Sequence, residues 1–133
     1  MSFEKFNNRR NDYIKAVGRL EEVLARDIQD DIIIDALLQR YEFTFELAWK
    51  MLRSYIRYEG LSDEANAPRS TIRVAFKHGL IENGEIWIEM MEDRNRSSHV
   101  YDEGVAFEIG NKIKSKYMHE FKNLKEKMKT IDL

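Results

Sequence analysis

Apolar residues recur at alternating three- and four-residue steps along most of this chain, and this spacing narrows the possible folds more than any other feature. Only one proline and six glycines interrupt the 133 residues. A fold made of many short strands needs more turn-forming residues than this, whereas the step length is that of one helix face. The pattern therefore predicts an all-α fold.

The first long helix is expected over residues 3–26. Its apolar side chains form one stripe that only Arg10 interrupts, which is typical of an amphipathic helix. The acidic stretch that follows ends this helix. Either Asp30 or Asp31 can cap the next one, because a short acidic side chain accepts hydrogen bonds from the first free N–H groups of a helix.

The second long helix is expected over residues 32–59 and has a wide apolar face. Two neighbouring stripes, one beginning at Leu37 and the other at Leu38, indicate burial on more than one side. Part of this face is a candidate contact with a second chain. Gly60 is a natural end of the helix, because glycine adopts the left-handed conformation without steric cost.

Two short helices follow. A loop that ends near Pro68 leads to Ser70, a candidate N-cap for a helix over residues 71–77. A second short helix is expected over residues 85–94.

A third long helix is expected to begin between Ser97 and Glu103 and to end near residue 129. No internal repeat, low-complexity tract or domain boundary interrupts the chain, so residues 1–133 are expected to form a single domain. Three long and two short helices joined by short loops predict an antiparallel up-and-down helical bundle.

Charge and composition exclude several classes of protein. With 22 basic and 24 acidic side chains, the formal net charge is −2. This argues against a non-specific nucleic-acid coat protein, which needs a broad basic surface, but it leaves room for a small phosphate site. The chain has no cysteine, which fits a reducing compartment, and no apolar run of about 18 residues, the length that spans a membrane. We therefore expect a cytoplasmic protein.

The stretch at residues 94–101 contains residue types that can cleave a phosphodiester. Arg94 stands five residues before His99. Arginine binds phosphate through a planar fork of donors, and histidine exchanges protons near neutral pH. His99 can act as the base or acid for attack of a ribose 2′-hydroxyl on the adjacent phosphate, while Arg94 stabilises the added charge. Asn95 is a candidate to orient the phosphate or His99.

Helical phase places constraints on this stretch. Arg94 continues an apolar stripe through Trp87 and Met90, so it needs a carboxylate, a carbonyl or a ligand anion as its partner. In one unbroken helix, five residues turn the side chain by about 140° net, and Arg94 and His99 would diverge.

A turn at Ser97 or Ser98 would let the two side chains converge. Either serine can then serve as the N-cap of the last helix, with His99 beside free backbone N–H groups that favour an anion.

A purely structural role is also compatible with the spacing. Arg94 can pair with Glu42 or Glu46 inside the bundle, His99 can cap a helix, and Tyr101 can be a core aromatic. A single histidine also falls short of an acid plus a base. A symmetric dimer would bring a second copy of the stretch to the same cleft.

Three blocks carry a resemblance to a known family: residues 41–50 (YEFTFELAWK), 68–70 (PRS) and 92–103 (EDRNRSSHVYDE). In this order they resemble the HEPN proteins once described as nucleotidyltransferase substrate-binding proteins, a group that includes the HepT toxins of the HepT/MntA type. The third block is the specific one, because it matches the group's Arg-x4-His-x-Tyr pattern at Arg94, His99 and Tyr101, with Asn95 also matching.

The resemblance implies a helical-bundle homodimer that acts as the endoribonuclease toxin of a toxin–antitoxin pair, with RNA as substrate, tRNA being one candidate, and without a metal or cofactor. It implies an MntA-like minimal nucleotidyltransferase as partner, which adenylylates Tyr101 with ATP. Glu42 is a candidate to support Arg94 from the second helix. The alternative from a different class is a non-catalytic subunit that presents a substrate to the nucleotidyltransferase.

Overall fold

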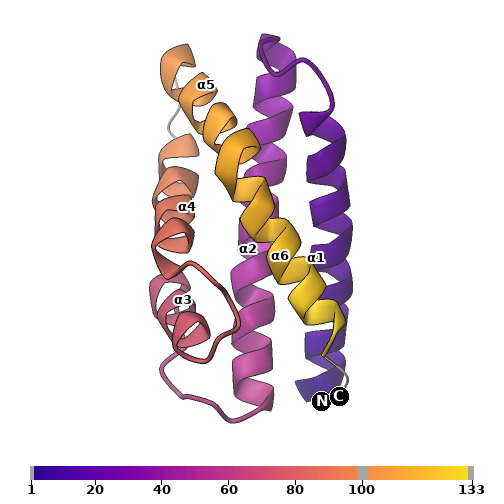
Figure 1. Ribbon diagram of the computed structural model, residues 1–133, viewed down its shortest axis with the longest axis vertical. Coiled ribbons are helices and arrows are strands. Elements are labelled where there is room, and N and C mark those ends of the chain that lie inside the picture. The colour runs from indigo at the N-terminus through magenta and orange to yellow at the C-terminus, as the bar shows by residue number, and fades with distance from the viewer. Residues whose placement is uncertain (1, 99–101, 132–133) are drawn as a thin grey trace.

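The computed structural model describes residues 2–98 and 102–131, and every regular element within these ranges is a helix. Helices α1 (Ser2–Leu24) and α2 (Asp31–Tyr58) lie antiparallel and form the most extensive helix pair. The shorter α3 (Pro68–Lys77) and α4 (Gly84–Ser97) follow one another along the other side of α2 (Figure 1). The predicted all-α antiparallel bundle is confirmed.

The last part of the chain crosses the face of the bundle as one continuous helical run (Figure 1). It consists of α5 (Glu103–Lys112), a π-helical turn η1 (Ile113–Tyr117) and α6 (Met118–Lys129). Within the described ranges, no helix combines the length and apolarity that crossing a bilayer requires.

The ends of α2 agree with the sequence-based prediction. Asp30 is the N-cap, and its carboxylate accepts hydrogen bonds from the backbone N–H groups of Ile32 at 2.8 Å and Ile33 at 3.3 Å. At the other end Gly60 has a φ of +65°, and the next residue, Leu61, donates its N–H to the Ile56 carbonyl at 3.0 Å. This pattern closes the helix by satisfying its last carbonyls.

The predicted start of α3 is wrong. Pro68, not a residue after Ser70, is the first helical residue, and Ala67 is the N-cap. Proline suits this position because its φ is already helical and its missing N–H would have no partner there. The Ser70 hydroxyl instead accepts the Ala67 N–H from inside the first turn, at 3.1 Å.

The last helical run begins at Glu103, within the predicted range, but the prediction that Ser97 or Ser98 caps it is wrong. Asp102 is the N-cap of α5, and its carboxylate accepts the Gly104 N–H at 2.8 Å. Ser97 is the last residue of α4, and Ser98 is its C-cap. The Ser98 hydroxyl donates to the Asn95 carbonyl at 3.0 Å, and the Ser97 hydroxyl shares its proton between the Arg94 carbonyl and Glu42, so both serines lie at the end of a helix rather than at its start.

The π-helical turn corrects a mismatch in the apolar stripe of the last helical run. Ile109, Ile113, Tyr117 and Phe121 follow one another at four-residue steps, and all four have 0% exposure. In an ideal α-helix each such step passes a full turn by about 40°, so three steps would carry the stripe out of the core. The wider turn η1 absorbs this drift and keeps Tyr117 facing α4.

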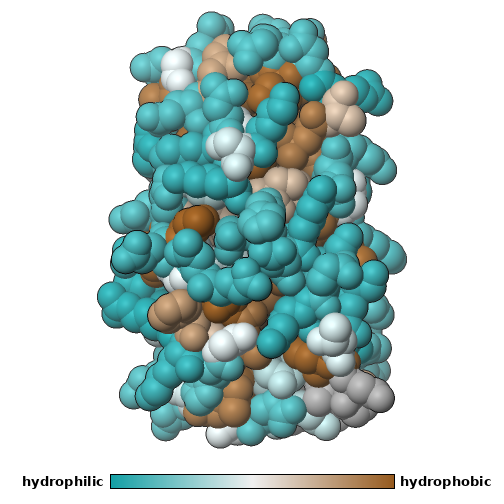
Figure 2. Space-filling view, in the orientation of Figure 1, coloured by the Kyte–Doolittle hydropathy of each residue, from teal (hydrophilic) through white to brown (hydrophobic). Residues whose placement is uncertain are grey.

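One chain suffices to cover most of the wide face of α2. The two predicted stripes are buried except at Tyr55 and Tyr58, near the end of the helix. Aromatic side chains from α1, α2, α4 and the last helical run fill the centre of the bundle, and among the largest fully buried ones are Trp87, Tyr13, Tyr41, Tyr117, Phe6, Phe45 and Phe121. The face drawn in Figure 2 is mostly hydrophilic, with apolar residues visible only between polar ones.

Arg10, the one break in the α1 stripe, joins the two ends of the fold. Its guanidinium donates to the carbonyl oxygens of Met128 at 3.1 Å and Ile131 at 2.8 Å. These carbonyls lie at the C-terminal end of α6, where helices lack partners for their last acceptors and favour a positive charge. The arginine is therefore a cap for α6 supplied by α1.

Replacing Asp30 with alanine should lower the free energy of unfolding by about 1 kcal/mol, because two N–H groups at the start of α2 lose their acceptor. Chemical denaturation monitored by circular dichroism measures this change. Asp31→Ala is the matched control. Asp31 lies in the first turn of α2, where its charge interacts favourably with the helix dipole, and it should contribute only about 0.5 kcal/mol to the free energy of unfolding. Equal losses in both variants would contradict the capping role.

Candidate functional site

Arg94 lies in the last turn of α4 and is held by a carboxylate from α2. Its Nη2 atom lies 3.0 Å from Oε1 of Glu46, and its side chain is 33% exposed. The Nε atom is buried and has no hydrogen-bond acceptor among the residues that the structure describes. Arg94 therefore has the acidic partner that its position requires, while its Nε–H donor has no hydrogen-bond acceptor among the described residues.

Glu46 connects this arginine to the rest of the α2 surface. Its Oε2 atom accepts a hydrogen bond from the indole N–H of Trp49 at 3.2 Å and lies 3.8 Å from the ammonium group of Lys50. The glutamate is therefore oriented by neighbours on its own helix, and Arg94 meets a carboxylate whose direction is already set.

Glu42, one turn earlier on α2, contacts the same end of α4 through a serine. Its Oε1 atom lies 2.7 Å from the Ser97 hydroxyl, which also lies 2.8 Å from the carbonyl oxygen of Arg94. The contact of Glu42 is thus with the backbone turn that carries Arg94, and the guanidinium pairs with Glu46 instead. A small hollow of ≈ 160 Å³ opens here and is lined by Asp35, Leu38, Gln39, Glu42 and Ser97.

The remaining residues of the predicted site are placed differently. Asn95 is exposed near the end of α4. His99 and Tyr101 lie outside the described residues, so the convergence of His99 with Arg94 stays a prediction. Within residues 2–98 and 102–131, no three histidine, aspartate or glutamate side chains are grouped so that they can hold a metal ion. Larger hollows of ≈ 580 Å³ beside α3 and ≈ 360 Å³ between α1 and α2 contain none of these site residues.

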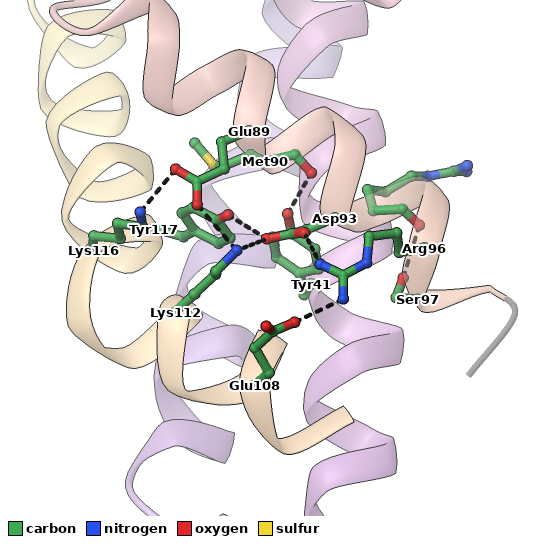
Figure 3. Close-up of polar contacts among 11 residues, drawn as sticks. Tyr41, Glu89, Met90, Asp93, Arg96, Ser97, Glu108, Lys112, Lys116 and Tyr117 are labelled. Atoms are coloured by element: carbon green, nitrogen blue, oxygen red, sulfur yellow. Dashed lines mark hydrogen bonds and ion pairs between the residues drawn. The ribbon is translucent and has the colours of Figure 1, made fainter. Parts of the chain in front are cut away.

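A buried carboxylate one residue before Arg94 fixes the position of the site. Asp93 is 2% exposed and receives three donors. The Tyr117 hydroxyl and the Lys112 ammonium group, at 3.1 Å, approach one oxygen, and Arg96 approaches the other at 2.9 Å (Figure 3). A buried carboxylate is stable only when its acceptor positions are filled in this way.

The network around Asp93 extends to acids on both sides. Glu89 lies 3.1 Å from Lys112 and 2.8 Å from Lys116, and Glu108 lies 2.7 Å from Arg96 (Figure 3). The hydrogen bond from Lys116, with that of Lys112, lowers the pKa of Glu89. Three acidic and three basic side chains therefore balance one another between α4 and the last helical run.

Two stacked tyrosines complete the support of α4. The Tyr41 hydroxyl donates to the Met90 carbonyl at 2.5 Å, and its ring stacks on that of Tyr117 with centroids 5.8 Å apart. Burial raises the pKa of both tyrosines, and for Tyr117 the hydrogen bond with Asp93 raises it further. The hydroxyl of Tyr117 thus remains a donor at neutral pH, as the carboxylate of Asp93 requires.

Sequence reasoning missed Asp93 although a signal was present. Asp93 follows Met90 by three residues, on the face of the helix that the stripe through Trp87 predicts to be buried. An acid at such a position implies a set of donors on a facing element. The apolar spacing around Tyr117 indicates only a core position. Its hydroxyl reaches Asp93 from a π-helical turn, which that spacing does not reveal.

The comparisons with known proteins agree on the family and the fold. The family model described as "Nucleotidyltransferase substrate binding protein like" matches residues 8–130. A Haemophilus influenzae protein named "Probable ribonuclease HepT" is 29% identical over a match that covers 62% of each chain, so this chain spans less than two thirds of that relative.

Two solved structures are similar as well. One from Thermus thermophilus has a TM-score of 0.72 and 30% identity, covering 86% of this chain and 93% of that one. One from Haemophilus influenzae, described as the fold of a substrate binding domain of a nucleotidyltransferase, has a TM-score of 0.81 and 24% identity, covering 91% and 99%; it bears on the fold alone.

Replacing Tyr117 with phenylalanine should lower the free energy of unfolding by about 1.5–3 kcal/mol, because Asp93 loses one of its three donors in a buried place. Denaturant titration measures the loss. Tyr58→Phe is the matched control, since Tyr58 is 39% exposed and its removal should change stability by less than about 0.5 kcal/mol. If the two variants are equally stable, Tyr117 does not sustain Asp93.

Proposed function

The chain belongs to the nucleotidyltransferase substrate binding protein like family, and on this premise we propose that it is an endoribonuclease that cuts RNA without a metal ion. The name of the Haemophilus influenzae relative, a probable ribonuclease, supports this proposal. So does the block at residues 92–103, which resembles the Arg-x4-His-x-Tyr pattern of HepT toxins.

The observation that carries the proposal is the state of Arg94. Its guanidinium is one third exposed at the end of α4, is aligned by Glu46 at 3.0 Å, and keeps a buried Nε without an acceptor among the described residues. A phosphate oxygen is the kind of acceptor that such a fork binds. Asp93 and Ser97 hold the backbone on either side, so the arginine can receive an anion without reorganising the helix.

In the proposed reaction, His99 removes the proton from a ribose 2′-hydroxyl. The 2′-oxygen forms a bond to the adjacent phosphorus, and the bond from phosphorus to the 5′-oxygen breaks. The leaving oxygen takes up a proton, so the products are a 2′,3′-cyclic phosphate and a 5′-hydroxyl. Arg94 stabilises the charge that builds up on the phosphate oxygens, and Asn95 orients the phosphate or His99.

We propose that two chains form the active unit. The motif of one chain supplies a single histidine, whereas the reaction uses both a base and an acid. A symmetric homodimer with facing motifs would provide two Arg94–His99 pairs in one cleft.

We further propose that the protein is a cytoplasmic toxin controlled by an MntA-like nucleotidyltransferase. The Tyr101 oxygen attacks the α-phosphorus of ATP, pyrophosphate leaves, and AMP remains on the tyrosine. The added phosphate stands two residues from His99 and competes with RNA for Arg94. Modification of Tyr101 would therefore switch the nuclease off.

A non-catalytic role is the second candidate. The description of the family as substrate-binding proteins favours a subunit that presents a substrate to a nucleotidyltransferase. The two candidates differ in one respect that can be measured, since only the nuclease cuts RNA in the absence of the partner.

Purified protein incubated with total RNA or tRNA in EDTA should cleave it, and His99→Ala and Arg94→Ala should lower the rate by at least about 100-fold. Cleavage is followed on denaturing gels. His119→Ala is the matched control, because His119 is an exposed histidine on α6 and should leave the rate unchanged. Unchanged cleavage in His99→Ala would refute the assignment, and its absence in the wild-type protein would favour the substrate-presenting role.

Co-expression with an MntA-like nucleotidyltransferase partner should place AMP on Tyr101, and the modified protein should lose its nuclease activity. Intact-mass spectrometry and peptide mapping detect the adduct, and Tyr101→Phe should remain unmodified and active. Tyr58→Phe, which keeps Tyr101, is the control that should still be modified. An adduct elsewhere in the chain would refute the regulatory role of Tyr101.

A further inference from the structure

Three arginines on α1 and α2 lie together outside the site described above. They are Arg9 on α1 and Arg53 and Arg57 on α2. Arg9 and Arg53 are partly buried and Arg57 is exposed. Arg53 and Arg57 stand four residues apart on one side of α2. The rings of Phe6 and Tyr55 lie 5.3 Å apart, so the part of α1 that carries Arg9 packs beside this part of α2. Burial, and after it the positive charges of Arg57 and Arg9, lowers the pKa of Arg53.

None of the three arginines of this cluster is paired with an acid in the described part of the chain. Among residues 2–98 and 102–131, no carboxylate oxygen lies within 4.0 Å of any of the three guanidinium groups. Arg57 has one neutral partner, the Asn66 side chain at 3.0 Å.

The local geometry favours an anion. Like charges held side by side repel, and a bound anion relieves that repulsion. The Nε atom of Arg9 is buried and has no acceptor in the described part of the chain. A buried donor lowers the stability of the fold unless an acceptor forms a hydrogen bond with it. A phosphate group offers several acceptor oxygens to a cluster of forked donors at once.

The cluster is continuous with the site at Arg94. The guanidinium of Arg53 lies 4.8 Å from the ring centroid of Trp49, Trp49 donates its indole N–H to Glu46, and Glu46 pairs with Arg94. Arg53 follows Glu46 by seven residues on α2, which corresponds to about 10 Å along the helix axis. The two arginine sites therefore lie beside different turns of α2, at a separation that an extended nucleic-acid strand can bridge and a single phosphate cannot.

We propose that Arg9, Arg53 and Arg57 bind a backbone phosphate of the RNA strand whose scissile phosphate lies at Arg94. The inference rests on the proposed ribonuclease function and extends it, because it assigns a second contact that positions the strand. The low net charge of the whole chain fits such a local contact rather than a broad nucleic-acid surface.

The test is the salt dependence of binding to a short fluorescein-labelled 2′-O-methyl RNA oligonucleotide, measured by fluorescence anisotropy. This probe lacks the attacking hydroxyl and stays intact. Each lost contact with a single-strand phosphate reduces the slope of log K against log salt by about 0.7. Because three arginines share one phosphate, we expect up to this reduction in Arg53→Gln and in Arg57→Gln. The second variant alters an exposed side chain whose contact within the fold is the hydrogen bond with Asn66.

Arg26→Gln is the matched control, because it removes the same charge from an exposed position beyond the other end of α1. Its slope should equal that of the wild-type protein. The inference is overturned if the wild-type protein does not bind the probe, if the two cluster variants keep the wild-type slope, or if Arg26→Gln loses as much.

Two further readouts separate the possible sources of the phosphate and the two proposals. If inorganic phosphate binds and its binding depends on Arg53, while binding of the oligonucleotide does not depend on Arg53, the assignment to an RNA strand is overturned. Binding that depends on Arg53 without any RNA cleavage would refute the nuclease and leave the phosphate contact standing. Cleavage with unchanged slopes would refute the contact and leave the nuclease standing.

Discussion

The fold around the site depends on the need to neutralise one buried carboxylate. Asp93 is almost fully enclosed, so its charge is tolerated only with donors on both oxygens. Those donors come from Arg96 on its own helix, Lys112 at the end of α5 and Tyr117 in the π-helical turn. The hydrogen bonds to Asp93 can form only when α4 and the last helical run are aligned in one way along their axes. This alignment fixes the position of α4, and so the direction in which the Arg94 side chain points.

The sequence predicted the helices well because periodicity is a local property. The positions of α1 and α2, the cap at Asp30 and the stop at Gly60 all follow from short-range preferences. The two errors, at Ser70 and at Ser97 or Ser98, have a common cause. A serine hydroxyl can cap the helix that follows it or bond to a backbone group three residues before it, and the residues around it decide between these roles. Ser70 bonds back to Ala67, and Ser98 bonds back to Asn95.

The parts of the site that could not be predicted depend on long-range contacts. Helical phase indicated that Arg94 needs a partner, but it could not choose Glu46 over Glu42, which lie one turn apart on the same helix. Likewise, the burial of Asp93 could be suspected from its place on the stripe through Met90. Its main partner, Tyr117, is 24 residues away and reaches it only through a local change of helix type.

The cap that Arg10 supplies to α6 has a consequence for the topology of the chain. By binding the Ile131 carbonyl it holds the two ends of the bundle side by side, at the opposite end of the molecule from α5 (Figure 1). A short peptide that joins these two ends of the bundle would therefore not cross the site, and a new start can be opened in the exposed loop between α2 and α3. The position at which the chain begins and ends is therefore independent of the helix packing that positions Arg94.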